Sequence, residues 1–306
     1  MHPEKFDVYA YGVIASSTLY LLEGDFPAQS GYAEFIKKLK NIGGEAANSA
    51  FVLARLGLKV KLDGNWINPD EDADFIKNIF KENQVDITRV SFQKCTGPKE
   101  MLIVDTNART IFGTYGHLSQ EKSWNLPKES DIANASVICL DPFFEGASLQ
   151  AVEYATKHKK PIVTVDCEFD DPIFRAADVV IISEEFLRDA YPTQDINKIT
   201  LIYQKNTKGS VILTFGSKEI LYGSQNEGWQ QFTPYQIDPI DTTGAGDSFR
   251  AGIIYGLVQK WQMARTVAFA SALAALVCQS YPGVLSAPRV EQVISFMEEH
   301  NQALSG

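Results

Sequence analysis

The pattern of hydrophobic and polar positions changes near residue 133. Beyond that point, four short runs are continuously apolar, as in strands buried on both faces: 136–140, 161–165, 177–182 and 210–214. Helical periodicity separates most of them, near residues 146–158, 184–191 and 195–208. Continuous apolar strands that alternate with helices are typical of a parallel sheet covered on both faces. We therefore predict an α/β fold of three layers, α/β/α, with a mostly parallel central sheet.

The first third of the chain adds a β-rich excursion to this pattern. Residues 6–12 form an apolar run that ends at a glycine, and a helix is predicted after residue 44 because Ala47, Ala50 and Ala54 fall on one face. Two short β-rich runs within 91–117 predict a hairpin. Together with the mixed segment 13–42, this hairpin is expected to form a small β-sheet lid.

The end of the chain is helical, over residues 245–260, 262–279 and 288–303. The second of these segments is rich in alanine, which favours close packing against a neighbour. The sequence shows no internal repeat and no linker, so residues 1–306 are interpreted as a single domain.

Composition and charge narrow the classes of function. The 306 residues carry a formal net charge of -10, which argues against a nucleic-acid partner. The apolar runs are too short for a membrane span, and the start of the chain does not read as a signal peptide. Four widely spaced cysteines without a C-x-x-C pair are typical of reduced thiols. We expect a cytoplasmic protein without a membrane partner.

One string near the C-terminus carries the clearest chemistry. Asp241-Thr-Thr-Gly-Ala-Gly-Asp247 lies where an extended segment gives way to a helical one. The small residues Gly244, Ala245 and Gly246 let a phosphate approach the N–H groups and the positive dipole of a helix N-terminus. Asp247 has two readings: a helix cap, or the base of a phosphoryl transfer. The sequence contains no Walker A, G-x-G-x-x-G, His-Glu-x-x-His or G-x-S-x-G motif.

The whole string resembles the C-terminal signature of the ribokinase-like (PfkB) carbohydrate kinases, with fructokinase-like and ketohexokinase-like members nearest in character. The resemblance implies that the Gly244-Ala245-Gly246 amides form an anion hole and that Asp247 deprotonates the acceptor hydroxyl. A carboxylate within hydrogen-bond reach of a hydroxyl is suited to that role.

A second string, Gly43-Gly44-Glu-Ala-Ala-Asn48, resembles the N-terminal signature of the same family. Taken alone, it reads more simply as a tight turn before a packed helix. The resemblance implies that Gly43 and Gly44 let the backbone approach the sugar, and that Asn48 binds its hydroxyls.

Further nucleotide and cation contacts follow from the resemblance. Thr214 and Gly216 match the family's Thr-x-Gly beside the nucleotide, although a strand-end turn explains them equally well. Gly283 matches a loop near the adenine. The carbonyls of Asp241 and Thr243 correspond to ligands of a monovalent cation, K+.

On the acceptor side, Arg109 aligns with lid arginines that approach a phosphate or sugar oxygen, and a solvated arginine is the alternative. Asp141 follows an apolar strand, where ligands collect in such sheets, although it is also a plausible loop cap.

The sequence departs from the family pattern mainly on the acceptor side. Ser17 stands where many members carry a sugar-binding aspartate, and a hydroxyl cannot replace a bidentate carboxylate. The family's Asn-x-x-Glu, which helps to place magnesium, falls at Ser183-Glu-Glu185-Phe, with the asparagine absent. Glu185 or its neighbour Glu184 is then the candidate for Mg2+.

These residues favour ATP-dependent phosphorylation of a sugar hydroxyl, with Mg2+ and K+ as the implied ions and with a homodimer formed through the lids. Two alternatives remain. A nucleoside kinase would need an aromatic side chain to stack on a base, for which Trp66, Phe143 and Phe144 are candidates. A sugar-binding protein that has lost catalysis would explain Ser17 and Ser183, but it would not need the base at Asp247.

Overall fold

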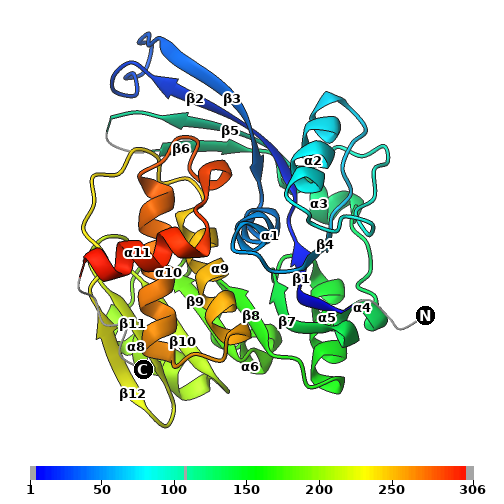
Figure 1. Ribbon diagram of the computed structural model, residues 1–306, viewed down its shortest axis with the longest axis vertical. Helices are drawn as coiled ribbons and strands as arrows, with labels where there is room; N and C mark the ends of the chain where they lie inside the picture. The colour runs from blue at the N-terminus through cyan, green and yellow to red at the C-terminus, as the bar shows by residue number, and fades with distance from the viewer. Residues whose placement is uncertain (1–4, 107–108, 301–306) are drawn as a thin grey trace.

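Two β-sheets organise the chain, whose computed structural model describes residues 5–106 and 109–300 (Figure 1). Within those residues the larger sheet has eight strands in the order β12-β11-β10-β9-β8-β7-β1-β4. The strands are β1 Phe6–Gly12, β4 Val60–Gly64, β7 Ala135–Leu140, β8 Ile162–Val165, β9 Val179–Ser183, β10 Ser210–Thr214, β11 Ile220–Ser224 and β12 Gly228–Phe232. The neighbouring strands from β10 to β4 in this order are parallel to one another. Strand β11 pairs antiparallel with both β10 and β12.

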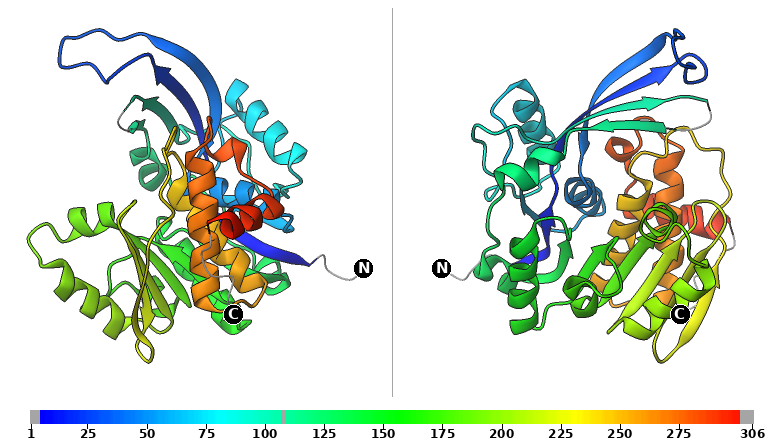
Figure 2. Two further views of the ribbon diagram at one scale, coloured as in Figure 1. Left: turned by 60° about the vertical axis from the view of Figure 1, so that its left-hand side comes forward. Right: turned by 180° about the vertical axis from the view of Figure 1, so that it is seen from behind.

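Helices cover both faces of this sheet (Figure 2). One face carries α1 Glu45–Arg55, α2 Glu71–Glu82, α9 Ala245–Val258, α10 Met263–Cys278 and α11 Val290–Glu299. The other carries α3 Gly116–Glu121, α4 Glu129–Asn134, α5 Glu145–Lys157, α6 Pro172–Ala176, α7 Glu184–Ala190 and α8 Ile196–Asn206. The predicted three-layer α/β/α fold is therefore confirmed. The antiparallel edge hairpin of β11 and β12 was not predicted, and residues 301–303 of the predicted last helix lie outside the described residues.

The smaller sheet is the predicted lid, in the order β3-β2-β5-β6. Its strands are β2 Ala15–Leu22, β3 Phe35–Gly43, β5 Lys99–Val104 and β6 Arg109–Gly113. Strand β1 runs almost directly into β2, and β3 runs directly into α1. The lid is therefore connected to the larger sheet through β1 and to α1 through β3.

The ladder register gives the lid an inner and an outer face, because directly paired side chains share a face. Leu19 of β2 pairs with Leu102 of β5, and both are buried with Val104 next to Tyr281. Ser17 and Glu100 are paired two residues earlier, and Arg109 is paired with Val104. These three polar side chains therefore belong to the inner face.

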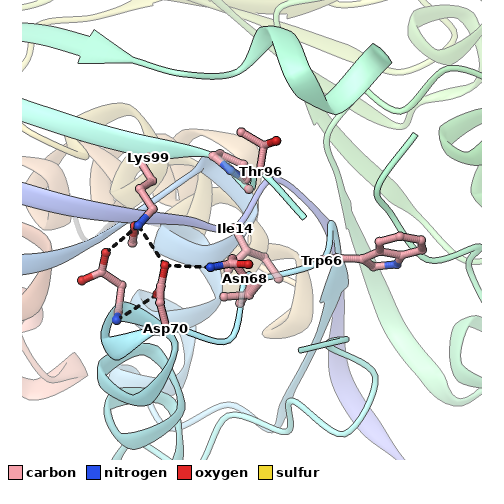
Figure 3. A pocket seen from close by; sticks show the side chains of 11 residues that line it. Ile14, Trp66, Asn68, Asp70, Thr96 and Lys99 are labelled. Atoms are coloured by element: carbon pink, nitrogen blue, oxygen red, sulfur yellow. Dashed lines mark hydrogen bonds and ion pairs between the residues drawn. The ribbon is translucent and has the colours of Figure 1, made fainter. Parts of the chain in front are cut away.

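An ion-paired cluster fastens the base of the lid to α2 (Figure 3). Lys99 of β5 lies 3.0 Å from Asp70 and 3.1 Å from Asp72. Asp70 also caps α2 by accepting the N–H groups of Asp72 and Ala73. Although partial burial raises the pKa of Asp70, hydrogen bonds from Asn68 and Lys99 outweigh it and lower the value to about 2.

No helix in the described part of the chain is both long and apolar enough to cross a membrane. Among the cysteines, Cys139, Cys167 and Cys278 are buried and Cys95 is half-buried, and all four are free.

The contact between α9 and α10 is as close as the alanine-rich sequence of α10 predicts. A Cβ at Gly252 would lie 2.5 Å from the Cα of Ala270, and one at Gly256 would lie 2.4 Å from the Thr266 hydroxyl. Such distances require the two helices to separate, because the obstructing atoms include backbone.

We expect Gly252→Ala to lower the free energy of unfolding by about 1–3 kcal/mol, because overpacking outweighs the better helix propensity of alanine. Gly146→Ala in α5 is the matched control, since an added Cβ there meets nothing within 4 Å. The control should be neutral or stabilising by up to about 1 kcal/mol. Urea denaturation of both variants tests this, and equal effects would contradict it.

Candidate active site

The loop before α9 is held in shape by the buried side chain of Asp241. One carboxylate oxygen accepts the N–H of Thr243 at 2.9 Å, and the other accepts the N–H of Gly283 at 3.1 Å. Gly244 then takes a left-handed conformation with φ 71°, and a Cβ there would lie 2.0 Å from the Val284 side chain. Only glycine fits both the conformation and the space, so the turn into α9 depends on this residue.

The first turn of α9 offers N–H groups to an anion. Ala245 N–H is bonded to the Thr242 carbonyl and Ser248 N–H to the Gly244 carbonyl. The N–H groups of Gly246 and Asp247 belong to the same turn, where an α-helix supplies no acceptor of its own. Donors at a helix N-terminus, aligned with the dipole, suit a phosphate group. The geometry thus agrees with the anion hole expected of Gly244, Ala245 and Gly246.

The two predicted signatures, 199 residues apart, meet at Asp247. The Asn48 amide of α1 donates to the Asp247 carboxylate at 2.8 Å, and the Ser49 hydroxyl donates to the Asp247 carbonyl at 3.2 Å. Burial raises the pKa of Asp247 to about 7, against the opposing effects of Arg250 and the Asn48 hydrogen bond. A carboxylate that titrates near neutral pH is suited to accept a proton.

Asp141 lies beneath this meeting point and is fully buried. One of its oxygens is 2.6 Å from the guanidinium of Arg250, which is also fully buried. The other accepts the N–H groups of Val13 and Ala46 at 2.7 and 3.1 Å. The prediction that Asp141 contacts substrate does not fit this geometry, because protein groups engage both oxygens. Asp141 is a positioning residue that joins β1, β7, α1 and α9.

The paired glycines lie between the base of the lid and the start of α1. Gly44 has φ 86°, and a Cβ there would lie 2.4 Å from the Val13 carbonyl oxygen. A Cβ at Gly43 would lie 2.1 Å from the carboxylate of Glu100, which is hydrogen-bonded by the Tyr115 hydroxyl. The lack of a side chain at both glycines therefore lets Val13 and Glu100 approach the backbone there. The Ser17 and Glu100 side chains share the inner face of the lid.

The expected nucleotide side lies at the carboxyl ends of β8, β9 and β10. Thr214 ends β10, and Gly216 follows it with φ 60° in a turn. Ser183 caps α7 and donates to Asp166 through its hydroxyl. Burial raises the pKa of Asp166, and the nearby charge of the exposed Glu185 adds to this effect.

The two carboxylates, Asp166 and Glu185, are the candidates for Mg2+ and its waters. Among the described residues, no group of three or more His, Cys, Asp or Glu side chains is arranged to hold a metal ion. Magnesium bound mainly by phosphates and water needs only one or two carboxylates, so this pair fits the ion.

A carbonyl pair near Gly283 fits the expected monovalent cation. A Cβ at Gly283 would lie 2.9 Å from the Thr243 carbonyl oxygen and 3.3 Å from that of Asp241. Both carbonyls therefore face the same loop, as a cation held by backbone oxygen requires.

Known proteins resemble this chain in sequence and in fold. The model of the pfkB family carbohydrate kinases matches residues 27–289 of the sequence. The chain belongs to this family. Among curated relatives, 5-dehydro-2-deoxygluconokinase from Clostridium beijerinckii is 22% identical over 293 residues, covering 86% of each chain. Ribokinase from Haemophilus influenzae is 23% identical over 269 residues, covering 84% of this chain and 87% of the relative.

Solved structures share the fold of this pfkB chain. A structure described as a putative ribokinase from Agrobacterium tumefaciens has a TM-score of 0.87 at 20% identity, covering 98% of this chain and 100% of the other. Arabidopsis thaliana ribokinase complexed with ribose and ATP has a TM-score of 0.80 at 18% identity, with 96% and 99% covered. A putative ribokinase II from E. coli in complex with ATP and Mg2+ has a TM-score of 0.77 at 17% identity, with 96% and 100% covered.

The aromatic residues considered for a nucleoside-binding pfkB enzyme are placed unevenly. Phe144 is fully buried, with its ring 5.1 Å from that of Trp124, so it cannot stack on a ligand. The indole of Trp66 donates to Asn125 beside the small pocket at the base of the lid (Figure 3). Phe143 is exposed. Phe144 is therefore excluded as a stacking residue, and Trp66 and Phe143 are the two candidates that stay.

Four residues of this site were not among the predicted ones: Glu45, Glu100, Asp166 and Arg250. Glu45 lies inside the second signature, and Arg250 lies three residues after Asp247 on a helix that is apolar beyond its first turn. A charged residue on an apolar helix is the signal that could have revealed Arg250. The role of Glu100 depends on strand register in the lid, which short-range spacing does not give.

We expect Arg250→Met to lower the free energy of unfolding by about 3–5 kcal/mol, because it leaves the Asp141 charge buried without its partner. The matched control is Lys218→Ala, which removes an exposed ion pair to Glu184 and should change stability by less than about 1 kcal/mol. Chemical denaturation followed by circular dichroism measures both. Similar small changes in the two variants would show that the buried pair is not a structural constraint.

Proposed function

We propose that the chain transfers the γ-phosphoryl group of ATP to a sugar hydroxyl, with Asp247 as the general base. The observation that carries this proposal is the position of Asp247. Its carboxylate is held by Asn48 of the sugar-side signature, and its backbone belongs to the helix turn that suits a phosphate. A base beside an anion hole is the arrangement that an in-line phosphoryl transfer needs.

In the proposed reaction the acceptor oxygen attacks the γ-phosphorus, its proton passes to Asp247, and ADP leaves. The N–H groups at the start of α9 stabilise the charge on the transferring phosphoryl group. Asp166 and Glu185 would hold magnesium and its waters, and the ion would supply positive charge to the phosphates. Thr214, Gly216 and Gly283 are proposed to border the nucleotide.

We also propose that K+ binds the carbonyls of Asp241 and Thr243, since both face Gly283. The ion would stabilise the loop that sets the anion hole. Comparison of the activity in potassium and in sodium salts tests this proposal. Residues 1–306 are proposed to form one kinase domain, because β1 and β3 connect the lid to the larger sheet without a linker.

We propose a sugar as the class of acceptor. The burial of Phe144 removes one of the three aromatic candidates for stacking on a nucleoside base, and Trp66 and Phe143 stay candidates. The relatives named above are a 5-dehydro-2-deoxygluconokinase and a ribokinase, so they do not single out the fructokinase-like character expected from the sequence. A cytoplasmic location fits the four free cysteines, and thiol titration of the unfolded chain would count them.

We expect Asp247→Asn to lower kcat by at least about a hundredfold while ATP binding persists, because the amide cannot accept the proton. The assay is ADP release with an accepted sugar, with nucleotide binding followed by calorimetry. The raised pKa of about 7 sets the pH profile: kcat/KM of the wild type should rise from pH 6 to pH 8 as Asp247 loses its proton. A variant that keeps full activity would refute the assignment.

We propose further that two copies pair through the outer faces of their lids. Ile36, Met101 and Phe112 are 62%, 40% and 48% exposed on this sheet. Apolar side chains on an exposed β-sheet favour association with another surface.

Phe112→Lys should therefore shift a dimer toward monomer in analytical ultracentrifugation. Leu126→Lys is the control, because Leu126 is 63% exposed but lies outside the lid. A monomeric wild-type protein would contradict the proposed dimer.

A further inference from the structure

The inner face of the lid places a carboxylate in the acceptor half of the site. Glu100 lies directly beside Ser17 in the ladder between β2 and β5, and its carboxylate packs on Gly43. Burial raises the pKa of Glu100, while Ser17, the Gly44 backbone and Arg109 lower it. Ser17 carries no charge, so Glu100 supplies the carboxylate of this pair of neighbouring strands.

The start of α1 adds hydrogen-bond acceptors that have no protein partner. Asn48 is only 6% exposed, and its amide nitrogen is bonded to Asp247, but its side-chain oxygen has no hydrogen-bond partner among the described residues. One carboxylate oxygen of Glu45 is likewise buried without a partner there. Buried polar atoms are normally hydrogen-bonded, so these two oxygens point to a ligand that brings donors.

Acidic groups outnumber basic groups around these oxygens. Three carboxyl groups, on Glu45, Glu100 and Asp247, belong to this part of the site, and the charge of Arg109 lowers the pKa of both Glu100 and Asp247. Arg250 also lowers the pKa of Glu45 and Asp247, but Asp141, with which its guanidinium is paired, raises both.

Nearby lysines of the lid are engaged elsewhere. Lys40 and Lys99 pair with aspartates at the start of α2, and Lys37 and Lys38 lie over the rings of Tyr281 and Tyr20.

Resting on the sugar-kinase function proposed above, we propose that the acceptor is an uncharged or amine-bearing sugar, and that Glu100 and Glu45 select it against sugar acids and sugar phosphates. Hydroxyl and ammonium groups donate hydrogen bonds, which match the unpartnered oxygens of Asn48 and Glu45. A carboxylate or phosphate would bring further acceptors and a further negative charge.

The negative charge of a sugar acid or sugar phosphate would also impair Asp247 as the base. The carboxyl groups already interact: burial, Asp141 and Asp247 together raise the pKa of Glu45 to about 8. An additional anion beside Asp247 would raise the pKa of Asp247 further above neutral, so that less of it could accept a proton. Selectivity and catalysis therefore favour the same class of acceptor.

The test compares acceptors built on one sugar ring that carry different charges: glucose, glucosamine, glucuronate and glucose 6-phosphate, with the corresponding ribose and fructose series. ADP release gives kcat and KM, and calorimetry with a non-hydrolysable ATP analogue gives binding without turnover. Uncharged or amine-bearing members should show KM and Kd values at least about tenfold lower than their anionic counterparts, as expected for hydrogen bonds to charged groups.

Two variants separate selectivity from folding. Glu100→Gln should raise KM for the preferred acceptor by about tenfold with little change in kcat, and it should weaken the discrimination against the acid. Glu45→Gln tests the same effects on KM and discrimination independently, through a side chain of α1. Glu34→Gln, an exposed lid carboxylate, is the control that should change neither constant.

The inference is overturned if a sugar acid or sugar phosphate is the best acceptor, or if folded Glu100→Gln leaves KM and discrimination unchanged. The sugar-kinase function would survive either result. If no acceptor promotes ADP release although ATP binds, the proposed function fails. Calorimetry then decides the inference: preferential binding of the uncharged or amine-bearing sugars supports it, and its absence contradicts it.

Discussion

The buried ion pair between Arg250 and Asp141 is the constraint on which the site depends. Asp141 directly follows β7, accepts the backbone N–H groups that follow β1 and begin α1, and pairs with an arginine of α9. Two buried charges are costly to desolvate, and their attraction offsets that cost only when hydrogen bonds fill the remaining positions. Here two N–H groups complete the contacts of Asp141, and the Ser49 hydroxyl accepts from Arg250 Nε, whereas Arg250 Nη2 has no hydrogen-bond partner among the described residues. These bonds fix how the two helices meet.

The position of those two helices determines the electrostatics at Asp247. The N-termini of α1 and α9 converge, and Asn48 of one contacts the base of the other. Burial alone would protonate Asp247 at neutral pH, whereas Arg250 and Asn48 act in the opposite sense and leave its pKa at about 7. The ion pair that organises the backbone thus also adjusts the charge of the proposed base. Arg250 therefore both holds the two helices together and lowers the pKa of the proposed base.

The sequence predicts features that depend on residues close together in the chain, and it does not predict features that depend on distant partners. The strands, the helices and the two glycine-containing turns are local patterns, and the structure confirms the fold that they imply. Asp141, Phe144 and Glu100 illustrate what could not be predicted. A strand-end aspartate, an aromatic residue after a strand and a lid glutamate each take their role from partners more than ten residues away. Strand register and burial decide those partners, and both arise only when the sheets assemble.

Ser17 and Glu100 are neighbours in one ladder, so the polar groups of β2 and β5 lie side by side on the inner face of the lid. The two positions differ in their connections. Strand β2 continues from β1 of the larger sheet, whereas β5 is fastened through Lys99 to α2. In the proposed role of Glu100, its carboxylate is placed by the lid and α2 together, so the proposed recognition of the acceptor depends on the position of the lid.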